Sequence, residues 1–300
     1  MKVLVTGSNG FIGGHVCKYL LNQGVYVIGL DLHDEMRKEC SEYIRFNLAT
    51  DDMSKILDTI SVDKIDAVVH LASDMRHEPY TVDVVTNNLR GTQKLLEYCI
   101  ENKMSSFVQL SSLPVIGSPK EVPIKENHSI KPPTVYHVTK YTQELLADYS
   151  NYTFGLRTAS FRICAPVGTG VNPKTIFPTF VRRALAGEDI TLIGKGTRRQ
   201  TYIHVNDIAQ ALYKALCNEN AQGTYNLASY NNLSNKELAE IIIKQLGSSS
   251  KIEFLDTPDP MDDYNWEVCI DKIANDIGYK PEVGIEYAID EYARYVRESE

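Results

Sequence analysis

A glycine-rich segment directly after the first apolar run of this 300-residue chain restricts the fold more than any other feature. The apolar run at 2–6 is followed by Gly7, Gly10 and Gly13, and the pattern then predicts a helix over residues 10–22. Glycines at this spacing allow a tight turn and a close approach of the helix to the strand. Because the first amides of such a helix point outward at the positive end of its dipole, the turn is suited to binding a phosphate group.

A carboxylate at the end of the next apolar run indicates which phosphate-containing ligand the turn would bind. Asp31 closes the run at 26–30, eighteen positions after Gly13, and the first Arg or Lys beyond it is Arg37. A carboxylate in this place accepts hydrogen bonds from both hydroxyls of an adenosine ribose and repels a 2′-phosphate. The unit therefore predicts a Rossmann-type site for NAD rather than NADP. If the glycines only shaped a tight connection and Asp31 were solvated, the agreement of turn, helix and acid would be unexplained.

The first half of the chain alternates apolar runs with helical stretches, which is typical of a parallel sheet covered by helices. The expected strands are 2–6, 26–30, 43–47, 67–72, 106–111 and 158–163, and the expected helices are 10–22, 80–103, 133–149, 177–185, 207–217, 235–246 and 284–297. We therefore expect an α/β fold with a Rossmann doubly wound parallel sheet and a smaller, discontinuous C-terminal substrate-binding lobe. The expected NAD-binding domain is 1–165 with returning segments near 200–228, of which a strand at 200–205 and the segment 223–228 are expected to rejoin the main sheet. The expected lobe is 166–199 and 229–300.

The composition excludes several classes of protein. A net charge of −8 disfavours a nucleic-acid partner, which would need clustered basic residues. Six separated cysteines without a CxxC pair indicate neither a zinc site nor a disulfide framework, so we expect no bound metal. The chain has no run of about 18 apolar residues and no basic region before a long apolar stretch, so we expect no membrane partner and a cytoplasmic location.

Tyr136 and Lys140 lie four residues apart in the helix expected at 133–149, and they therefore share one face of it. A nearby ammonium group favours the phenolate, which would lower the tyrosine pKa from about 10 and allow proton exchange with a substrate hydroxyl near neutral pH. Ser111 and Ser112 end the preceding strand, at the edge where such sheets bind ligands. Alone, such a pair is more often a surface contact of an amphipathic helix, and only its combination with the glycine turn and the serines favours catalysis.

With these features together, the sequence resembles the extended short-chain dehydrogenase/reductase family, which includes NAD-dependent nucleotide-sugar epimerases, dehydratases and reductases. The resemblance is strongest to UDP-glucose 4-epimerase-like enzymes and runs along nearly the whole chain. The segments that carry it are 6–13, Asp31, 70–73, 88–92, 111–112, 136–140 and 202–207.

The resemblance implies a role for each matching residue. Tyr136 would transfer the proton, Lys140 would also hold the nicotinamide ribose, and Ser112 would hydrogen-bond the reacting oxygen. Ser112 is favoured over Ser111 because it stands five residues before Gly117, as the catalytic residue of the family stands before its Tyr-Gly pair. The other residues expected to bind NAD are Gly7, Asn9, Gly10, Phe11, Ile12, Gly13, Asp31, Asn47, Leu48, Leu71, Ala72, Ser73, Asn88, Ser111 and Pro166.

The residues after Ser112 narrow the reaction. The dehydratases of the family usually place an Asp-Glu pair after the catalytic Thr, whereas here Leu113 and Pro114 follow, which cannot transfer protons. Pro114 also fills the place of the cysteine that coupled epimerase-reductases use. We therefore expect hydride transfer at a carbinol carbon in an NAD-dependent sugar epimerase. A reductase or dehydrogenase of a keto-sugar and a non-catalytic dinucleotide-sensing protein stay open as alternatives.

The expected substrate is a nucleotide sugar, although three positions depart from the UDP-hexose epimerases. Ala165 stands in place of a diphosphate-contacting Asn, Gln200 in place of an Arg, and the stretch 257–267 has no Arg. The usual guanidinium clamp for a diphosphate is thus missing, which leaves another phosphorylated or glycosidic substrate open. The residues that we expect to bind substrate are Arg76, Ser112, Arg182, Arg198, Arg199 and Gln200, with Tyr80 and His77 as further candidates. The alternative for the arginines is solvated surface charge.

Two long helices are candidates for a homodimer interface. Many relatives pair such helices across a two-fold axis, and the equivalents here are expected at 80–103 and 133–149. Their apolar positions are Val84, Val85, Leu95, Leu96, Leu145 and Leu146. These positions suit either a partner or the core, and packing on the sheet accounts for at least half of them.

Overall fold

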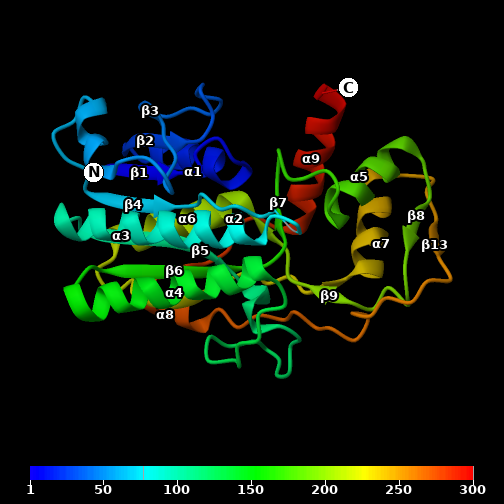
Figure 1. Ribbon diagram of the computed structural model, residues 1–300. Helices are drawn as coiled ribbons and strands as arrows, with labels where there is room; N and C mark the ends of the chain where they lie inside the picture. Colours follow the sequence, from blue (N-terminus) through cyan, green and yellow to red (C-terminus); the bar gives the residue numbers. More distant parts are fainter. Residues whose placement is uncertain (77, 300) are drawn as a thin grey trace.

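The central element of the fold is a parallel sheet of seven strands in the order β3-β2-β1-β4-β5-β6-β11 (Figure 1). The computed structural model describes residues 1–76 and 78–299, except for the side chain of residue 57. The strands are β1 (Lys2–Thr6), β2 (Tyr26–Asp31), β3 (Glu42–Arg45), β4 (Ala67–His70), β5 (Ser106–Ser112), β6 (Thr158–Ile163) and β11 (Gly223–Leu227). The chain winds outward from β1 to β3 and then returns to build the other half from β4, so the doubly wound Rossmann fold is confirmed.

Alternate residues of the strands supply the two faces of the sheet. One face is covered by α1 (Phe11–Asn22), α6 (Val205–Cys217) and α8 (Asp271–Ile277), and the other by α3 (Gly91–Glu101) and α4 (Val135–Phe154). In β1, Val3 and Val5 pack in the first core, whereas Leu4 packs in the second. Both faces are therefore apolar, as expected for a parallel sheet covered on both sides.

The long helix expected at 80–103 is interrupted. The helix α2 (Thr81–Val85) continues into a π-helical turn, η3 (Thr86–Arg90), before α3 begins at Gly91. Such turns are frequent at functional sites. Here the turn contains Asn88, which is buried.

A smaller lobe lies beside the carboxyl edge of the sheet (Figure 1). Its core is built by α5 (Ile176–Ala186), α7 (Asn235–Leu246) and α9 (Ile285–Ser299). Three two-stranded sheets join its segments: β8 (Ile190–Leu192) with β13 (Ile252–Phe254), β9 (Arg199–Gln200) with β12 (Leu233–Ser234), and β7 (Pro166–Val167) with β10 (Ile203–His204). The exact domain boundaries stay a prediction.

Short 3₁₀ turns lie in the connections, at η1 (Met53–Lys55), η2 (Leu57–Thr59) and η4 (Leu113–Ile116). Among the described residues, no helix combines the length and the apolar character that crossing a membrane requires.

The expectation that residues 200–205 return to the main sheet is wrong. They form β9 and β10, which pair with β12 and β7 instead. Between them, the N–H of Tyr202 donates to the side chain of Asn231 at 2.8 Å, which interrupts the strand. His204 then caps α6 by accepting from the N–H of Asn206, so the helix begins two residues earlier than expected. The segment Gly223–Leu227 does join the sheet, next to β6.

Candidate active site

A cavity of about 1140 Å³ lies where the carboxyl edge of the sheet meets the smaller lobe. Most of the residues expected to bind NAD line it, namely Gly7, Gly10, Phe11, Ile12, Gly13, Asp31, Asn47, Leu48, Leu71, Ala72, Ser73, Asn88 and Pro166. Three residues expected to bind substrate also line it: Arg76, Arg198 and Gln200. The topology therefore gathers residues that are far apart in the sequence around one space.

The turn between β1 and α1 has room for backbone only. Gly7 has a φ of +71°, and a Cβ there would lie 2.8 Å from the backbone nitrogen of Ala72. A Cβ on Gly13 would lie 2.0 Å from the carbonyl oxygen of Gly7. In the described part of the chain, no side chain caps α1 at its N-cap residue Gly10, so its first N–H groups remain available to a ligand. The turn is thus a cradle for a phosphate group.

The Asp31 carboxylate is fixed at the end of β2. One oxygen accepts from the N–H of Asn9 at 3.0 Å, and the other lies 2.7 Å from Nδ1 of His33. The Asn9 side chain points away from the cavity and donates to the carbonyl of Glu35. Asn9 therefore orients Asp31 through its backbone and holds the loop after β2 through its side chain, rather than lining the cavity.

A buried chain of polar groups fixes the wall between β1 and β4. His70 lies between two hydroxyls, with Thr6 Oγ1 at 2.7 Å from Nδ1 and Thr92 Oγ1 at 3.0 Å from Nε2. Because Thr6 Oγ1 already accepts from the N–H groups of residues 71–72, its proton goes to Nδ1, and Nε2 carries the ring proton. Burial, followed by the Lys140 charge, lowers the pKa of His70 to about 3, so the ring stays neutral.

Asn88 connects the cavity wall after β4 to the start of α4. Its Oδ1 accepts from the N–H of Asp74 at 2.7 Å, and its Nδ2 donates to the Asp74 carbonyl at 2.9 Å and to the Thr139 hydroxyl at 3.0 Å. Thr139 in turn donates to the carbonyl of Tyr136 at 2.7 Å. Asn88 therefore positions the segment after β4, which lines the cavity.

Lys140 lies directly behind the cavity wall. Its Nζ donates at 3.0 Å to the carbonyl oxygen of Leu110, which is a lining residue. Burial lowers the pKa of Lys140 to about 8, and the Glu144 carboxylate opposes this shift. The side chain therefore still carries its charge at neutral pH.

Tyr136 lies in the first turn of α4, which begins after the cap residue Thr134. Burial raises its pKa to about 12. The Ser73 hydroxyl acts in the opposite direction and favours a lower pKa of Tyr136, although the two hydroxyls do not meet the geometry of a normal hydrogen bond. The expectation of a Tyr136 pKa below about 10 is therefore wrong in this geometry, because burial outweighs any lowering by the Lys140 ammonium, which lies over the ring, 5.9 Å from its centroid, and donates to Leu110.

The two serines at the end of β5 have different surroundings. The Ser111 hydroxyl is buried and donates to Glu144 of α4. Ser112 is the last residue of the strand and is half-buried. Neither is among the lining residues, and because successive side chains of a strand point to opposite faces, the Ser111 hydroxyl is turned away from the expected NAD contact. The role of Ser112 stays a prediction.

The arginines expected to bind substrate do not all reach the cavity. Arg198 lines it, whereas Arg199 points the other way and pairs with Glu237 at 2.9 Å. Arg182 lies on α5 beside Tyr292, and it lines a separate hollow of about 450 Å³. The expectation is therefore wrong for Arg199, because neighbouring residues of a strand face opposite ways, and for Arg182, because its face of α5 is turned from the cavity.

Arg76 lines the cavity with its charge already paired. Its guanidinium is 2.6 Å from the Asp74 carboxylate and lies over the ring of Tyr80. His77 lies outside the described residues.

Three alternate residues of the segment around β9 line the cavity: Arg198, Gln200 and Tyr202. The Nε of Arg198 and the hydroxyl of Tyr202 are buried, and neither has a hydrogen-bond partner within the described residues. Such groups are rare in folded proteins, and a ligand with acceptor atoms would satisfy them. Tyr202 is not among the expected site residues, although its two-residue spacing from Gln200 is a usable signal.

The model of the NAD dependent epimerase/dehydratase family matches residues 3–228 of the chain. The low-salt glycan biosynthesis protein Agl12 of Haloferax volcanii is 30% identical over 85% of this chain and 86% of its own length. A dTDP-glucose 4,6-dehydratase of Actinoplanes is 29% identical over 99% of this chain and 98% of its own.

Solved structures match over the whole chain. A mutant UDP-glucuronic acid 4-epimerase from Bacillus cereus, in complex with UDP-4-deoxy-4-fluoro-glucuronic acid and NAD, superposes with a TM-score of 0.87, 25% identity and coverage of 100% of both chains. A UDP-glucose 4-epimerase from Thermotoga maritima with UDP-glucose gives a TM-score of 0.88 at 22% identity, covering 100% of this chain and 99% of that one.

Proposed function

Because this chain belongs to the NAD-dependent epimerase/dehydratase family, whose members are enzymes that use NAD, we propose that it inverts a carbinol carbon of a nucleotide sugar. Tyr136 exchanges the hydroxyl proton in this proposal. The observation that carries it is the placement of Tyr136 and Lys140 against Ser73 and Leu110, two residues of the cavity wall.

The cavity residues fit NAD. The cradle at Gly7 and Gly13 leaves no room for a Cβ, which suits the close approach of a pyrophosphate. The Asp31 carboxylate, held by Asn9, suits the ribose hydroxyls of adenosine. When bound, NAD supplies the acceptor and donor of hydride.

Tyr136 and Lys140, which contact the wall of the cavity, supply the acid–base group and the positive charge that proton transfer needs. Tyr136, with its raised pKa, holds a proton at rest and must first give it to solvent. The phenolate then accepts the proton of the substrate hydroxyl while the carbinol carbon gives up its hydride, and Tyr136 returns that proton to the carbonyl oxygen when hydride is added to the other face. Lys140 is protonated at neutral pH, and its positive charge stabilises the phenolate when Tyr136 gives up its proton. Ser112, at the end of β5, would donate the second hydrogen bond to the reacting oxygen.

The turn after Ser112 favours epimerisation over dehydration. Leu113 is buried in η4, and Pro114 follows it in the same turn. Neither side chain can remove a proton from carbon or return one, which the elimination of water requires. Simple inversion at the carbinol needs no further acid or base.

A diphosphate or another anionic group of the substrate supplies the acceptors that Arg198 and Tyr202 require. Both are buried polar groups at the cavity without a partner in the described part of the chain. Arg198 lies two residues before Gln200, where UDP-hexose epimerases usually have their Arg. It would therefore replace that guanidinium from a neighbouring position.

We also propose a homodimer built on α2 and α4. Val84, Leu95 and Leu96 are buried in the core of the subunit itself. Other apolar side chains of these helices are exposed: Val82 by 76%, Leu145 by 50% and Tyr152 by 91%. A surface of this kind supports pairing with a second copy.

The proposed activity is tested by incubating the purified protein with UDP-glucose, UDP-glucuronic acid, UDP-N-acetylglucosamine and dTDP-glucose and by following C4 inversion with NMR. A keto-sugar product with release of the cofactor would instead support a dehydrogenase. The variant Tyr136→Phe reports whether the observed activity uses the proposed acid.

A further inference from the structure

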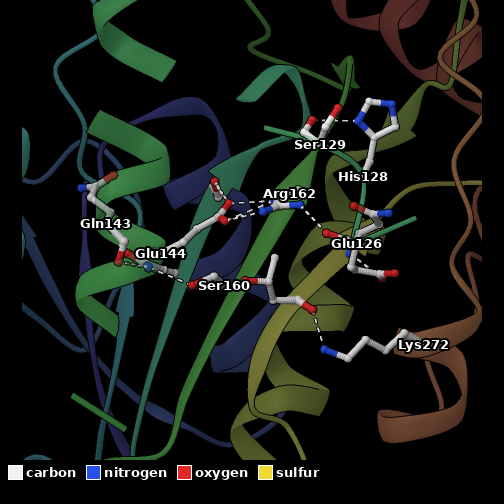
Figure 2. A network of polar contacts seen from close by, with 12 residues as sticks. Glu126, His128, Ser129, Gln143, Glu144, Ser160, Arg162 and Lys272 are labelled. Carbon is white, nitrogen blue, oxygen red and sulfur yellow. Dashed lines mark hydrogen bonds and ion pairs between the residues drawn. The ribbon is translucent and has the colours of Figure 1, made fainter. Parts of the chain in front are cut away.

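An ion pair deep in the molecule joins α4 to the sheet. Arg162 of β6 makes two parallel hydrogen bonds to Glu144, from Nε to Oε1 at 2.9 Å and from Nη2 to Oε2 at 2.7 Å (Figure 2). The side chains are 5% and 2% exposed. This two-pronged geometry is the strong form of a charged hydrogen bond.

Neighbouring groups occupy the remaining positions around the pair. The Ser111 hydroxyl of β5 donates to Glu144, and Nη1 of Arg162 donates to the Glu126 carbonyl at 3.0 Å. The Glu126 carboxylate accepts in turn from the N–H of Asn226 in β11 at 3.0 Å. The resulting network joins β5, β6 and β11 with the loop before α4 and with α4 itself. Figure 2 shows Glu144, Arg162 and Glu126 within it.

Stability alone is a weak reason for such a pair. The cost of removing both charges from water is often as large as their mutual attraction, and apolar residues of similar volume often stabilise a protein as well or better. The network therefore calls for an explanation in terms of the site next to it.

The proposed active-site residue nearest to this ion pair along α4 is Lys140. It precedes Glu144 by four residues, so both lie on the same face of α4. The other titratable groups around its ammonium are Tyr136 on α4 and the neutral His70 of β4, and the Arg162 guanidinium of β6 is paired with Glu144. Among these described groups, Glu144 carries the negative charge that favours a buried ammonium.

We propose that Glu144, held in place by Arg162 and Ser111, is a positioning residue that keeps Lys140 protonated behind the cavity wall. The directions of the pKa shifts support this assignment. Burial lowers the pKa of Lys140, Glu144 acts in the opposite direction, and the net value is about 8. The inference rests on the proposed role of Lys140. Without the carboxylate, the lysine would lose its proton, and with it the charge that stabilises the Tyr136 phenolate, at a lower pH.

The test measures the Lys140 titration directly. The protein is labelled with ¹³C at the lysine Cε, and the Lys140 resonance is assigned by its loss in Lys140→Met. In Glu144→Gln, the Lys140 titration should move to lower pH by about one unit or more, the size expected for one close charge. Asp148→Asn removes a carboxylate one turn farther along α4 and should leave the titration in place. An unchanged titration in folded Glu144→Gln would overturn the proposal.

Glu144→Gln leaves Arg162 buried without its partner and risks unfolding. The double variant Glu144→Gln/Arg162→Gln removes both charges, and it should recover thermal stability relative to the single variant. Lys140 should still titrate at lower pH than in the unmodified protein, by less than in the single variant, because the more distant Arg162 charge that opposes its protonation is lost as well. A merely structural pair predicts the same recovery with an unmoved titration. Because neither measurement needs substrate, a protein that shows the shift but does not epimerise any sugar would contradict the proposed function and leave this inference standing.

Discussion

The Nζ of Lys140 donates a 3.0 Å hydrogen bond to the carbonyl oxygen of Leu110, which forms part of the cavity wall. Through this contact a fully buried lysine holds its charge next to the cavity without entering it. The Tyr136 ring lies beside the same ammonium. This pair is where the account predicts the largest effects on activity.

Lys140→Met should reduce turnover by about 10²-fold or more, because the charge that stabilises the phenolate is lost. Turnover of the unmodified enzyme should fall as the pH rises above about 8, where Lys140 loses its proton. A pH profile of kcat for both proteins checks this expectation. A profile of Lys140→Met that falls in the same pH range would contradict it.

Stability should depend on Lys140 in the opposite sense. Its folded pKa of about 8 lies below the ordinary value of 10.5, so between these pH values the unfolded chain binds the extra proton and stability rises with pH. At pH 7 the buried charge costs up to about 3 kcal/mol, which Lys140→Met does not incur. Between pH 8 and pH 10, the unfolding free energy of the unmodified protein should therefore rise relative to that of Lys140→Met, by an amount of the same order as this cost. Denaturant titrations at several pH values measure it.

Tyr136→Phe should lower kcat by about 10²- to 10⁴-fold, since the proton donor is removed, and should leave NAD affinity within a few-fold. Steady-state kinetics and calorimetric titration with NAD separate the two effects. Retained turnover would show that another residue transfers the proton.

Gly13→Ala should weaken NAD binding by about tenfold or more, because its Cβ would lie 2.0 Å from the Gly7 carbonyl and the cradle must open. The matched control is Gly284→Ala, where the added Cβ would meet only the flexible end of Glu286 at 3.2 Å. NAD titration should register a loss for the first variant and none for the second. Equal affinities would mean that the turn does not hold the pyrophosphate.

Arg198→Met should raise KM for the nucleotide sugar by about tenfold or more, the usual effect of losing a hydrogen bond to a charged group. Its neighbour provides the control, because Arg199 faces Glu237 and Arg199→Met should leave KM nearly unchanged. An increase in KM for Arg199→Met and none for Arg198→Met would mean that the anionic group of the substrate binds on the other side of β9.

Leu145→Glu should convert a dimer into monomers, because it places a charge in the exposed apolar surface of α4. Phe254→Glu makes the same change at a 50% exposed residue of β13 and should keep the dimer. Size-exclusion chromatography with light scattering distinguishes these outcomes.

Features set by short-range pattern could be predicted from the sequence. The turn from Gly7 to Gly13 and the carboxylate of Asp31 depend on residues within one βαβ unit, and the cavity contains them as expected. Lys140 and Tyr136 share a helix, so their proximity was also predictable. The direction of the Tyr136 pKa shift was not, because it depends on burial by distant segments.

Features set by long-range packing could not be predicted in this way. Ser111 and Arg199 belong to the expected motifs, yet Glu144 and Glu237 decide where their side chains point. The ion pair of Arg162 and Glu144 joins a strand to a helix, and no short-range spacing in the sequence predicts such a contact. Similarly, residues 200–205 look like a strand, and only the contact of Tyr202 with Asn231 divides them.

The most direct measurement follows UDP-sugars by NMR in the presence of the purified protein, with no NAD added beyond what the protein retains. The account predicts that one of them accumulates its C4 epimer up to an equilibrium ratio, without accumulation of reduced nicotinamide, and that Tyr136→Phe stops this conversion. Oxidised sugar formed in step with reduced nicotinamide, with no epimer, would contradict the account and identify a dehydrogenase instead.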